Sequence, residues 1–393
     1  MKHLVLAGLF LIIASSCQSV TNEKTTLPPI SPGAWQTKEY LPLLTGKSVA
    51  LIVNPTSTIY DTHLVDSLIA LGIDIKVIFS PEHGFRGDAD AGEKVNNSID
   101  EATGIPIISL YGKHRKPTTE DLLDIDVVVF DIQGVGVRFY TFISTMHYIM
   151  EGCAENNKPL IILDRPNPNG NYIAGPILDQ NYQSFVGMHP IPIVYGLTMG
   201  ELAQMINNEG WLESGKCDFT VIKNKNYSHK DTYELPVKPS PNLPNAKSIE
   251  LYPYLCLFEP TTISIGRGTT YPFQVIGFPD STYGDYSFTP VSIEGMSKYP
   301  KYEDQKCFGV DLREGKSASN FSLSYLVDYY NKFGGGEAFF TSPGFFDKLA
   351  GSDNLRLQIL AGKSAEEIES SWSEGLEDYK VLRKKYLLYD DFE

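Results

Sequence analysis

The chain has 393 residues, of which 42% are hydrophobic, and contains 33 glycines and 25 prolines. This is an ordinary globular composition that excludes whole-chain disorder and a collagen-like repeat, and its length suits two or three domains. The formal net charge is −15, which argues against a general nucleic-acid binder because neutralising phosphates requires a basic face.

The first 17 residues are typical of an export signal. A short positive start precedes the apolar run 4–14, which is too short to span a bilayer. The small residues 14–16 before Cys17 resemble a lipobox, the bacterial site at which a cysteine is lipidated after cleavage. A plain secretory signal with an incidental cysteine is the alternative. We expect a lipoprotein anchored through Cys17 to the outer membrane and facing the periplasm, with 18–40 as a polar tether.

The remaining cysteines give no sign of a zinc ribbon, because none of them forms a CxxC pair. In an exported chain some of them could form disulfides, and buried unpaired thiols are the alternative. These cysteines are Cys153, Cys217, Cys256 and Cys307.

The first half of the chain alternates short β-branched runs with helical patterns. The predicted strands are 48–53, 73–79, 105–110, 126–130 and 160–163. They are continuously apolar, which indicates strands buried on both faces of a parallel sheet. The predicted helices are 63–71, 118–123, 139–157 and 199–208, the last with a capping-box pattern. This alternation predicts an α/β fold with a Rossmann-like, doubly wound parallel sheet.

A proline-rich stretch at 235–244 interrupts this pattern and predicts a domain boundary, or a functional loop where two domains meet. Extended segments follow, and then helices near 322–333 and 365–383. We therefore predict a Rossmann-like catalytic domain at 41–240. A smaller α+β domain at 241–393 would complete the cleft.

Polar side chains follow each of the predicted buried strands. In a parallel sheet these positions share the carboxyl edge, where open α/β folds bind ligands, so we predict an active site there. Taken singly, each residue could instead cap a helix or accept backbone amides. The candidates are Asn54, Glu82, His83, Arg86, Asp131, Gln133, Arg138, Asp164, Arg165 and Asn167. Two short loops of the second domain, 257–262 and 264–269, add Glu259 and Arg267.

Other site chemistries have weaker support. The chain has no HExxH motif or second clustered histidine, so a metal site is disfavoured. Gly134 and Gly136 follow a strand as in a dinucleotide loop, but Phe139 occupies the place of the third glycine. No phosphate loop and no GxSxG nucleophile elbow occurs. We therefore expect neither an organic cofactor nor a metal.

Several of these segments together resemble the exo-β-N-acetylmuramidases of the NamZ type. The matching motifs are SPEHGFRG (80–87), DIQGVGVRFYTF (131–142), DRPNPNG (164–170), GLTMGELA (196–203), PSPNLPN (239–245) and SIGRGT (264–269). The resemblance runs from about Thr45 to Tyr389. It implies a Rossmann-like domain and a smaller domain with the site between them, and Glu82 as the catalytic glutamate. It also implies release of terminal N-acetylmuramic acid from the non-reducing ends of peptidoglycan fragments.

The chain departs from this family pattern at two positions. Tyr195 precedes Gly-Leu-Thr where many relatives carry histidine, and Pro260 follows Glu259 where glycine is common. The departure at Tyr195 gives weight to a second hypothesis, a non-catalytic lipoprotein that binds peptidoglycan saccharides.

Glycoside cleavage usually uses two carboxyl groups, and the sequence offers a set of candidates for them. Glu82 suits the general acid, provided that an apolar cleft disfavours its charged form. Glu259 and Asp131 are candidates for the second carboxyl, and the substrate's own 2-acetamido group is a third possibility. An arginine could hold the lactyl carboxylate that distinguishes N-acetylmuramic acid, Arg86 being the first candidate and Arg267 the second.

Overall fold

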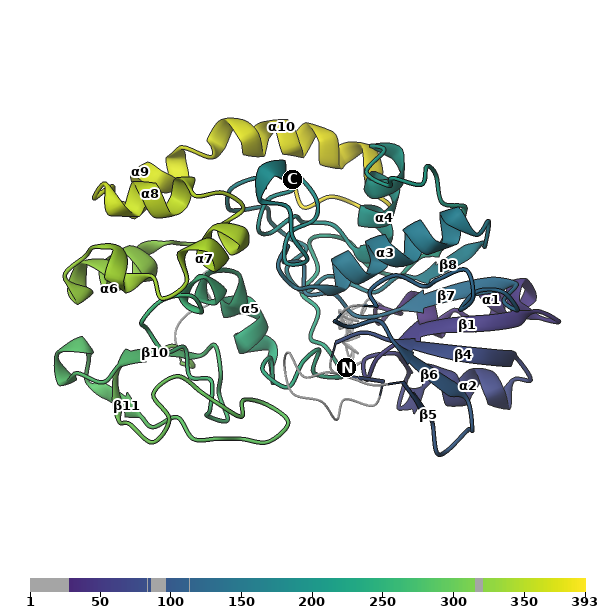
Figure 1. Ribbon diagram of the computed structural model, residues 1–393. Helices are drawn as coiled ribbons and strands as arrows, with labels where there is room; N and C mark the ends of the chain where they lie inside the picture. The colour runs from purple at the N-terminus through teal and green to yellow at the C-terminus, as the bar shows by residue number, and fades with distance from the viewer. Residues whose placement is uncertain (1–27, 83, 86–96, 113, 315–320) are drawn as a thin grey trace, which may run out of the picture.

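The first half of the chain forms a seven-stranded sheet in the order β5-β6-β4-β1-β7-β8-β9 (Figure 1). The computed structural model describes residues 28–82, 84–85, 97–112, 114–314 and 321–393. The strands are β1 Ser48–Val53, β4 Asp74–Ser80, β5 Ser98–Ile99, β6 Pro106–Ser109, β7 Val127–Asp131, β8 Leu160–Leu163 and β9 Phe219–Ile222. Only β5 runs antiparallel to its neighbour. The chain winds outward in both directions from β1, so the predicted doubly wound fold is confirmed.

Alternate residues of the central strands enter two separate apolar clusters. Val49, Leu51 and Val53 of β1 pack with helices α1 Thr37–Leu44 and α2 Leu64–Ala70. Ala50 and Ile52 pack in the other cluster, with α3 Phe142–Glu155 and α4 Met199–Asn208. Both faces are therefore covered, which is why these strands read as continuous apolar runs.

One predicted helix is absent, the edge strands β5 and β9 were not predicted, and one capping motif holds in detail. No helix forms at 118–123, where Asp121 accepts hydrogen bonds from the Thr118 amide and hydroxyl and closes a turn. β9 was not predicted, because its partly exposed residues do not form a continuous apolar run. The capping box at Thr198 and Glu201 is confirmed at the start of α4.

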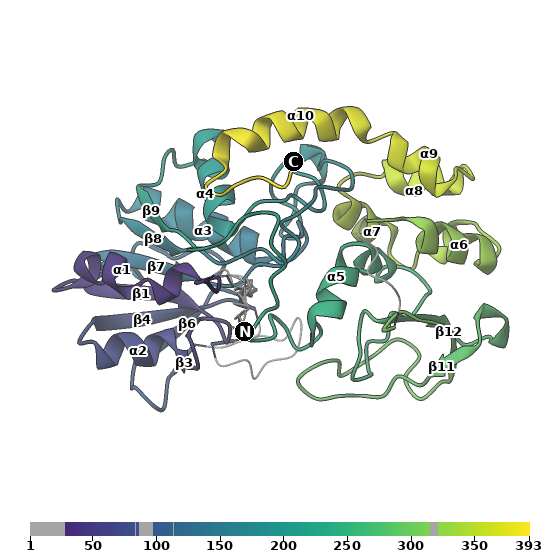
Figure 2. The same ribbon diagram turned by 180° about the vertical axis from the view of Figure 1, so that it is seen from behind.

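The second half of the chain combines a small sheet with helices (Figure 2). The sheet is antiparallel and has the order β10-β12-β11. Its strands are β10 Val275–Phe278, β11 Tyr286–Phe288 and β12 Cys307–Asp311. The helices are α5 Ala246–Leu255, α6 Ser324–Phe333, α7 Pro343–Ala350, α8 Asn354–Leu360, α9 Ala365–Ser370 and α10 Ser373–Arg383. The helix predicted at 365–383 is thus two helices, with Trp372 at the break packed against the core.

Shorter elements complete the described chain. A two-stranded ribbon pairs β2 Thr58–Ile59 with β3 Thr62–His63. The 3₁₀ helices are Gly33–Trp35, Gln180–Tyr182, Cys256–Phe258, Ser281–Tyr283, Glu337–Phe339 and Lys384–Tyr386.

The C-terminal segment returns to the first half of the chain, and α10 lies across both parts in Figures 1 and 2. Tyr379 donates a hydrogen bond to the Tyr195 carbonyl at 2.8 Å, and Arg383 donates to the Gly196 carbonyl at 2.7 Å. One apolar cluster contains residues of both halves. These contacts hold the two parts together, and the domain limits 41–240 and 241–393 remain a prediction.

The four cysteines after residue 27 are buried and unpaired, as in the thiol alternative. Within the described ranges, no helix is long and apolar enough to cross a membrane. Over the same ranges, no group of three or more His, Cys, Asp or Glu side chains is placed to hold a metal ion.

Candidate active site

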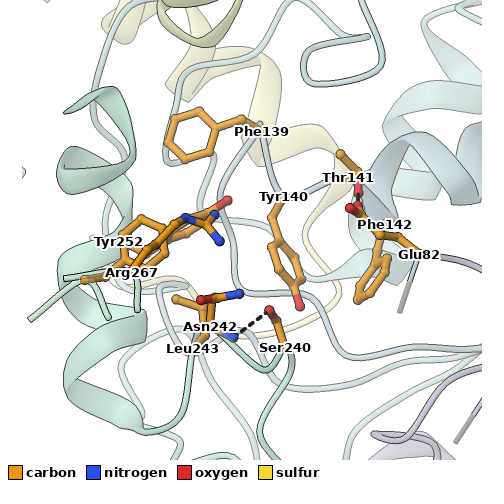
Figure 3. A pocket seen from close by; sticks show the side chains of 11 residues that line it. Glu82, Phe139, Tyr140, Thr141, Phe142, Ser240, Asn242, Leu243, Tyr252 and Arg267 are labelled. Atoms are coloured by element: carbon orange, nitrogen blue, oxygen red, sulfur yellow. Dashed lines mark hydrogen bonds between the residues drawn. The ribbon is translucent and has the colours of Figure 1, made fainter. Parts of the chain in front are cut away.

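A cavity of about 100 Å³ lies where the carboxyl edge of the large sheet meets the second half of the chain (Figure 3). Four separate segments supply its walls: the loop after β4, the residues leading into α3, the proline-rich stretch, and α5 with the loop after it. The lining residues are Glu82, Phe139, Tyr140, Thr141, Phe142, Ser240, Asn242, Leu243, Tyr252, Arg267 and Phe273. This volume is small for a ligand pocket.

Glu82 enters the cavity two residues after β4 ends at Ser80. Thr141 Oγ1 donates a hydrogen bond to Glu82 Oε2 at 3.2 Å. Burial, together with a hydrogen bond to Glu82, raises the pKa of Tyr111 to about 12, so this phenol keeps its proton at neutral pH. Among the described residues, Glu82 is the one carboxylate that lines the cavity.

Aromatic rings make most of the remaining wall. Tyr252 makes edge-to-face contacts with Phe139 and Phe273, with ring centroids 5.4 and 5.0 Å apart. Tyr140 packs edge-on against Tyr252 and donates its hydroxyl to the Pro239 carbonyl at 2.6 Å. Burial, and to a lesser extent Glu82, raises the pKa of Tyr140 well above its usual range. A wall of this kind displaces water and offers flat apolar surfaces to a sugar ring.

Arg267 lines the cavity and is held by Glu259. Its Nη2 and Nε donate to Glu259 Oε1 at 2.5 and 3.1 Å, and its guanidinium lies 5.2 Å from the Phe273 ring centroid. Glu259 itself is not among the lining residues. Glu259 therefore holds the Arg267 guanidinium at the cavity and does not itself supply a second carboxylate to the cavity wall.

Asp131 and Arg165, two of the predicted site residues, form an ion pair inside the protein. Arg165 Nε and Nη2 contact the two Asp131 carboxylate oxygens at 2.6 and 2.9 Å. The Asp131 side chain is 0% exposed and the Arg165 side chain is 2% exposed. Neither of them lines the cavity. These contacts are those of a structural pair, with every oxygen of the carboxylate used by the arginine.

Asn54 and Gln133 also form hydrogen bonds inside the protein, at the carboxyl edge of the sheet. Asn54 Oδ1 accepts hydrogen bonds from the backbone amide and the hydroxyl of Thr56. The Thr56 hydroxyl oxygen in turn accepts a hydrogen bond from the backbone amide of Gln133. Gln133 Nε2 donates to the carbonyls of Gly134 and Pro166. Both side chains are buried and hold the loops that follow β1, β7 and β8 in fixed positions.

Arg138, Asp164 and Asn167 are likewise buried and lie outside the cavity lining. The Arg138 guanidinium donates to four backbone carbonyls, two of them in α7. Asp164 accepts from Thr198, Gly200 and Tyr389, and burial raises its pKa to about 6. Asn167 lies so close to Gly136, which has φ of 74°, that a Cβ there would be 2.2 Å from Asn167 Oδ1. Arg138 and Asn167 help to fix the 131–142 loop, whereas Asp164 holds the start of α4. Only glycine fits at position 136.

Three predicted residues lie outside the described residues: His83, Arg86 and Cys17. Tyr195, the departure from the family pattern, is 1% exposed and is not among the cavity-lining residues. This position therefore leaves the wall of the cavity unchanged. Sequence reasoning did not single out Tyr140, Asn242 or Tyr252, although the first two stand inside quoted motifs.

A carboxylate and an arginine lining one aromatic-walled cavity, at the carboxyl edge of a Rossmann-like sheet, fit a glycoside hydrolase. Comparison with known proteins defines the class further. Residues 49–247 match the N-terminal domain of exo-β-N-acetylmuramidase NamZ, and residues 250–389 match its C-terminal domain. The chain belongs to this NamZ family.

Two kinds of relative agree with this assignment. The chain is 41% identical over 401 residues to the peptidoglycan β-N-acetylmuramidase NamZ of Bacillus subtilis strain 168, covering 96% of this chain and 95% of that protein. It resembles two solved DUF1343 family proteins of Bacteroides fragilis NCTC 9343. One is 47% identical, with a TM-score of 0.86 and coverage of 93% of this chain and 100% of the other. The second is 32% identical, with a TM-score of 0.79 and coverage of 92% and 100%.

Proposed function

We propose that this protein is a glycoside hydrolase that releases terminal N-acetylmuramic acid from the non-reducing ends of peptidoglycan fragments. The observation that carries this function is the presence of Glu82 and Arg267 in the same small cavity. A proton donor and a reader of a carboxylate are the two groups that hydrolysis of this sugar requires. The family membership and the B. subtilis relative support hydrolysis over a non-catalytic saccharide binder.

Glu82 acts as the general acid in this proposal. Its proton passes to the glycosidic oxygen as the bond from that oxygen to C1 breaks. Water then supplies the hydroxyl at C1, and its other proton returns to Glu82. The group that acts beside Glu82, as nucleophile at C1 or as base, is open among Glu259, Asp131 and the substrate's acetamido group. The single carboxylate in the described lining favours the acetamido group, because Glu259 is engaged by Arg267 and Asp131 by Arg165.

A chromogenic assay tests the hydrolase function. The purified protein is incubated with the 4-nitrophenyl β-glycoside of N-acetylmuramic acid without any added cofactor. We expect nitrophenol release. Binding of the sugar without release supports the non-catalytic alternative, and absence of both contradicts the proposal.

We predict that Arg267 contributes to selection of the lactyl carboxylate. A charged hydrogen bond of this kind is worth about 1.5–3 kcal/mol, so wild type should prefer the N-acetylmuramic acid glycoside over the N-acetylglucosamine glycoside by roughly 10–100-fold. Arg267→Ala should lose that preference. The measurement is the ratio of kcat/KM for the two glycosides.

Two further variants complete this comparison. Arg313→Ala is the matched control, because Arg313 pairs with Asp311 and is not among the lining residues. Arg86→Ala is made in parallel, since Arg86 was the first candidate in the sequence. If wild type cleaves both glycosides equally well, the site does not read the carboxylate. If the preference survives in Arg267→Ala, another residue reads it.

We also propose that the chain is exported and lipidated at Cys17, which would anchor it to the outer membrane facing the periplasm. The short apolar run and the small residues before Cys17 support this. We expect wild type to enter the detergent phase in detergent phase separation. Cys17→Ala should give a water-soluble or uncleaved protein. Wild type in the aqueous phase would refute the anchor.

A further inference from the structure

Lys301 is a partly buried lysine whose ammonium group contacts the backbone of one short segment, residues 259–263. Its Nζ donates hydrogen bonds to the carbonyls of Glu259 and Ile263 at 3.3 and 2.9 Å, and a third to the carbonyl of Thr261. An ammonium has three N–H donors, so all of them are used on this segment.

The two other carbonyls of the segment are also held from outside it. The Pro260 carbonyl accepts a hydrogen bond from the Ser342 amide at 3.2 Å, and the Thr262 carbonyl accepts one from the Tyr302 hydroxyl at 2.5 Å. Lys301 therefore contacts three of the five carbonyls, and its loss would release three acceptors at once.

The segment that Lys301 holds leads to the cavity through Glu259. The Glu259 carboxylate accepts two hydrogen bonds from Arg267, which lines the cavity opposite Glu82 in Figure 3. The Arg267 side chain is 28% exposed, so a ligand can reach it. Because the backbone at Glu259 sets the place of its carboxylate, it also sets the place of the guanidinium.

We propose that Lys301 is a positioning residue for Arg267, and that it thereby determines how well the cavity selects the lactyl carboxylate of N-acetylmuramic acid. This inference rests on the proposed function. Lys301 is not among the described lining residues, so it acts through the 259–263 segment and does not touch the sugar.

The protonation state of Lys301 gives this role a pH dependence. Burial, with a smaller contribution from Arg267, lowers the pKa of Lys301 to about 8, and Glu259 opposes the shift. A neutral amine has only two N–H donors for the three carbonyls. The hold on the segment should weaken as the pH rises through this value, while the lactyl carboxylate and Arg267 keep their charges. An arginine at position 301 would stay charged throughout.

The test compares two variants of Lys301 with a control. Lys301→Met removes the donors and keeps an unbranched apolar chain, whereas Lys301→Arg keeps a charged donor. Lys298→Met is the control, because Lys298 lies in the same part of the chain but is exposed and is not among the lining residues. Each protein is assayed for kcat/KM with the 4-nitrophenyl β-glycosides of N-acetylmuramic acid and N-acetylglucosamine. Calorimetry with the two free sugars and a thermal melt complete the set.

Wild type and Lys298→Met are expected to prefer the N-acetylmuramic acid glycoside by roughly 10–100-fold, and Lys301→Met should lose most of that preference. The loss should fall on the N-acetylmuramic acid glycoside alone, and Lys301→Arg should restore the preference. A general disturbance of the structure would instead slow both glycosides. An unchanged preference in folded Lys301→Met, or an equal loss for both glycosides, overturns the inference.

If Lys301→Met does not fold, the pH dependence of wild type decides. The preference should fall at least about 2-fold between about pH 7 and about pH 9.5, the effect of one lost hydrogen bond, and should hold in Lys301→Arg. A general acid affects both glycosides alike, so its titration cancels in the ratio. A wild-type preference that stays constant over this range overturns the inference.

The two proposals fail separately in this design. Cleavage of the N-acetylmuramic acid glycoside with an unchanged preference in Lys301→Met removes the role of Lys301 and leaves hydrolysis standing. Selective binding of free N-acetylmuramic acid that Lys301→Met abolishes, without cleavage by wild type, supports Lys301 and contradicts hydrolysis. Equal binding and cleavage of the two sugars by wild type overturns the inference together with the role of Arg267.

Discussion

Glu82→Gln is expected to lower kcat/KM for the N-acetylmuramic acid glycoside by at least about 10²–10⁴-fold, the usual contribution of a general acid. The amide keeps the size of the side chain and an oxygen that accepts the hydrogen bond from Thr141, but it has no proton to give to the leaving oxygen. The melting temperature should stay close to that of wild type, since the substitution removes no apolar packing. Initial rates and a thermal melt on the same sample measure both effects.

Glu155→Gln is the control for this variant, because Glu155 forms an exposed ion pair with Lys116 and does not line the cavity. Its rate should match wild type. A folded Glu82→Gln protein with near-native turnover would remove Glu82 from the mechanism. The proton would then have to come from a group that is not among the described lining residues.

Arg165→Ala is expected to reduce the free energy of unfolding by about 3–5 kcal/mol at neutral pH. The substitution leaves the Asp131 carboxylate, which is 0% exposed, without the guanidinium that contacts both of its oxygens. A buried charge that loses its partner costs much more than a surface pair is worth. Urea unfolding followed by circular dichroism measures the change.

Arg313→Ala is the comparison for this effect, since Arg313 pairs with Asp311 nearer the surface and such pairs contribute about 0–1 kcal/mol. The paired variant Arg165→Met with Asp131→Leu removes both charges and should recover much of the loss. A loss below about 1 kcal/mol in Arg165→Ala would mean that Asp131 is not held as a buried charge.

The sequence was sufficient to predict the five central strands of the sheet because strands buried on both faces leave a clear pattern. β1 and β8 have the bounds expected from their apolar runs. β9 left no such pattern because it is partly exposed, with Thr220 among its four residues. The break between α9 and α10 was also hidden, since the residues around Trp372 remain compatible with a continuous helix.

The candidate site was harder to predict, because polar residues at strand ends have two uses. Glu82 follows β4 and Asp131 ends β7, two strands whose carboxyl ends lie at the same edge of the sheet. Glu82 nevertheless lines the cavity, whereas Asp131 pairs with Arg165 inside the protein. This difference depends on which side chain finds an internal partner, and such partners are distant in sequence. Asn242 was missed for a related reason: it lines the cavity while its side chain is held by the Met296 carbonyl, 54 residues away.

The measurement that most directly tests the proposed function uses two disaccharides that contain the same pair of sugars in opposite order. In one, N-acetylmuramic acid is at the non-reducing end and is β-linked to N-acetylglucosamine. In the other, N-acetylglucosamine is at the non-reducing end. Wild type without cofactor should release free N-acetylmuramic acid from the first and leave the second intact, and Glu82→Gln should release none. Cleavage of both disaccharides, or of neither, would contradict an exo-acting N-acetylmuramidase.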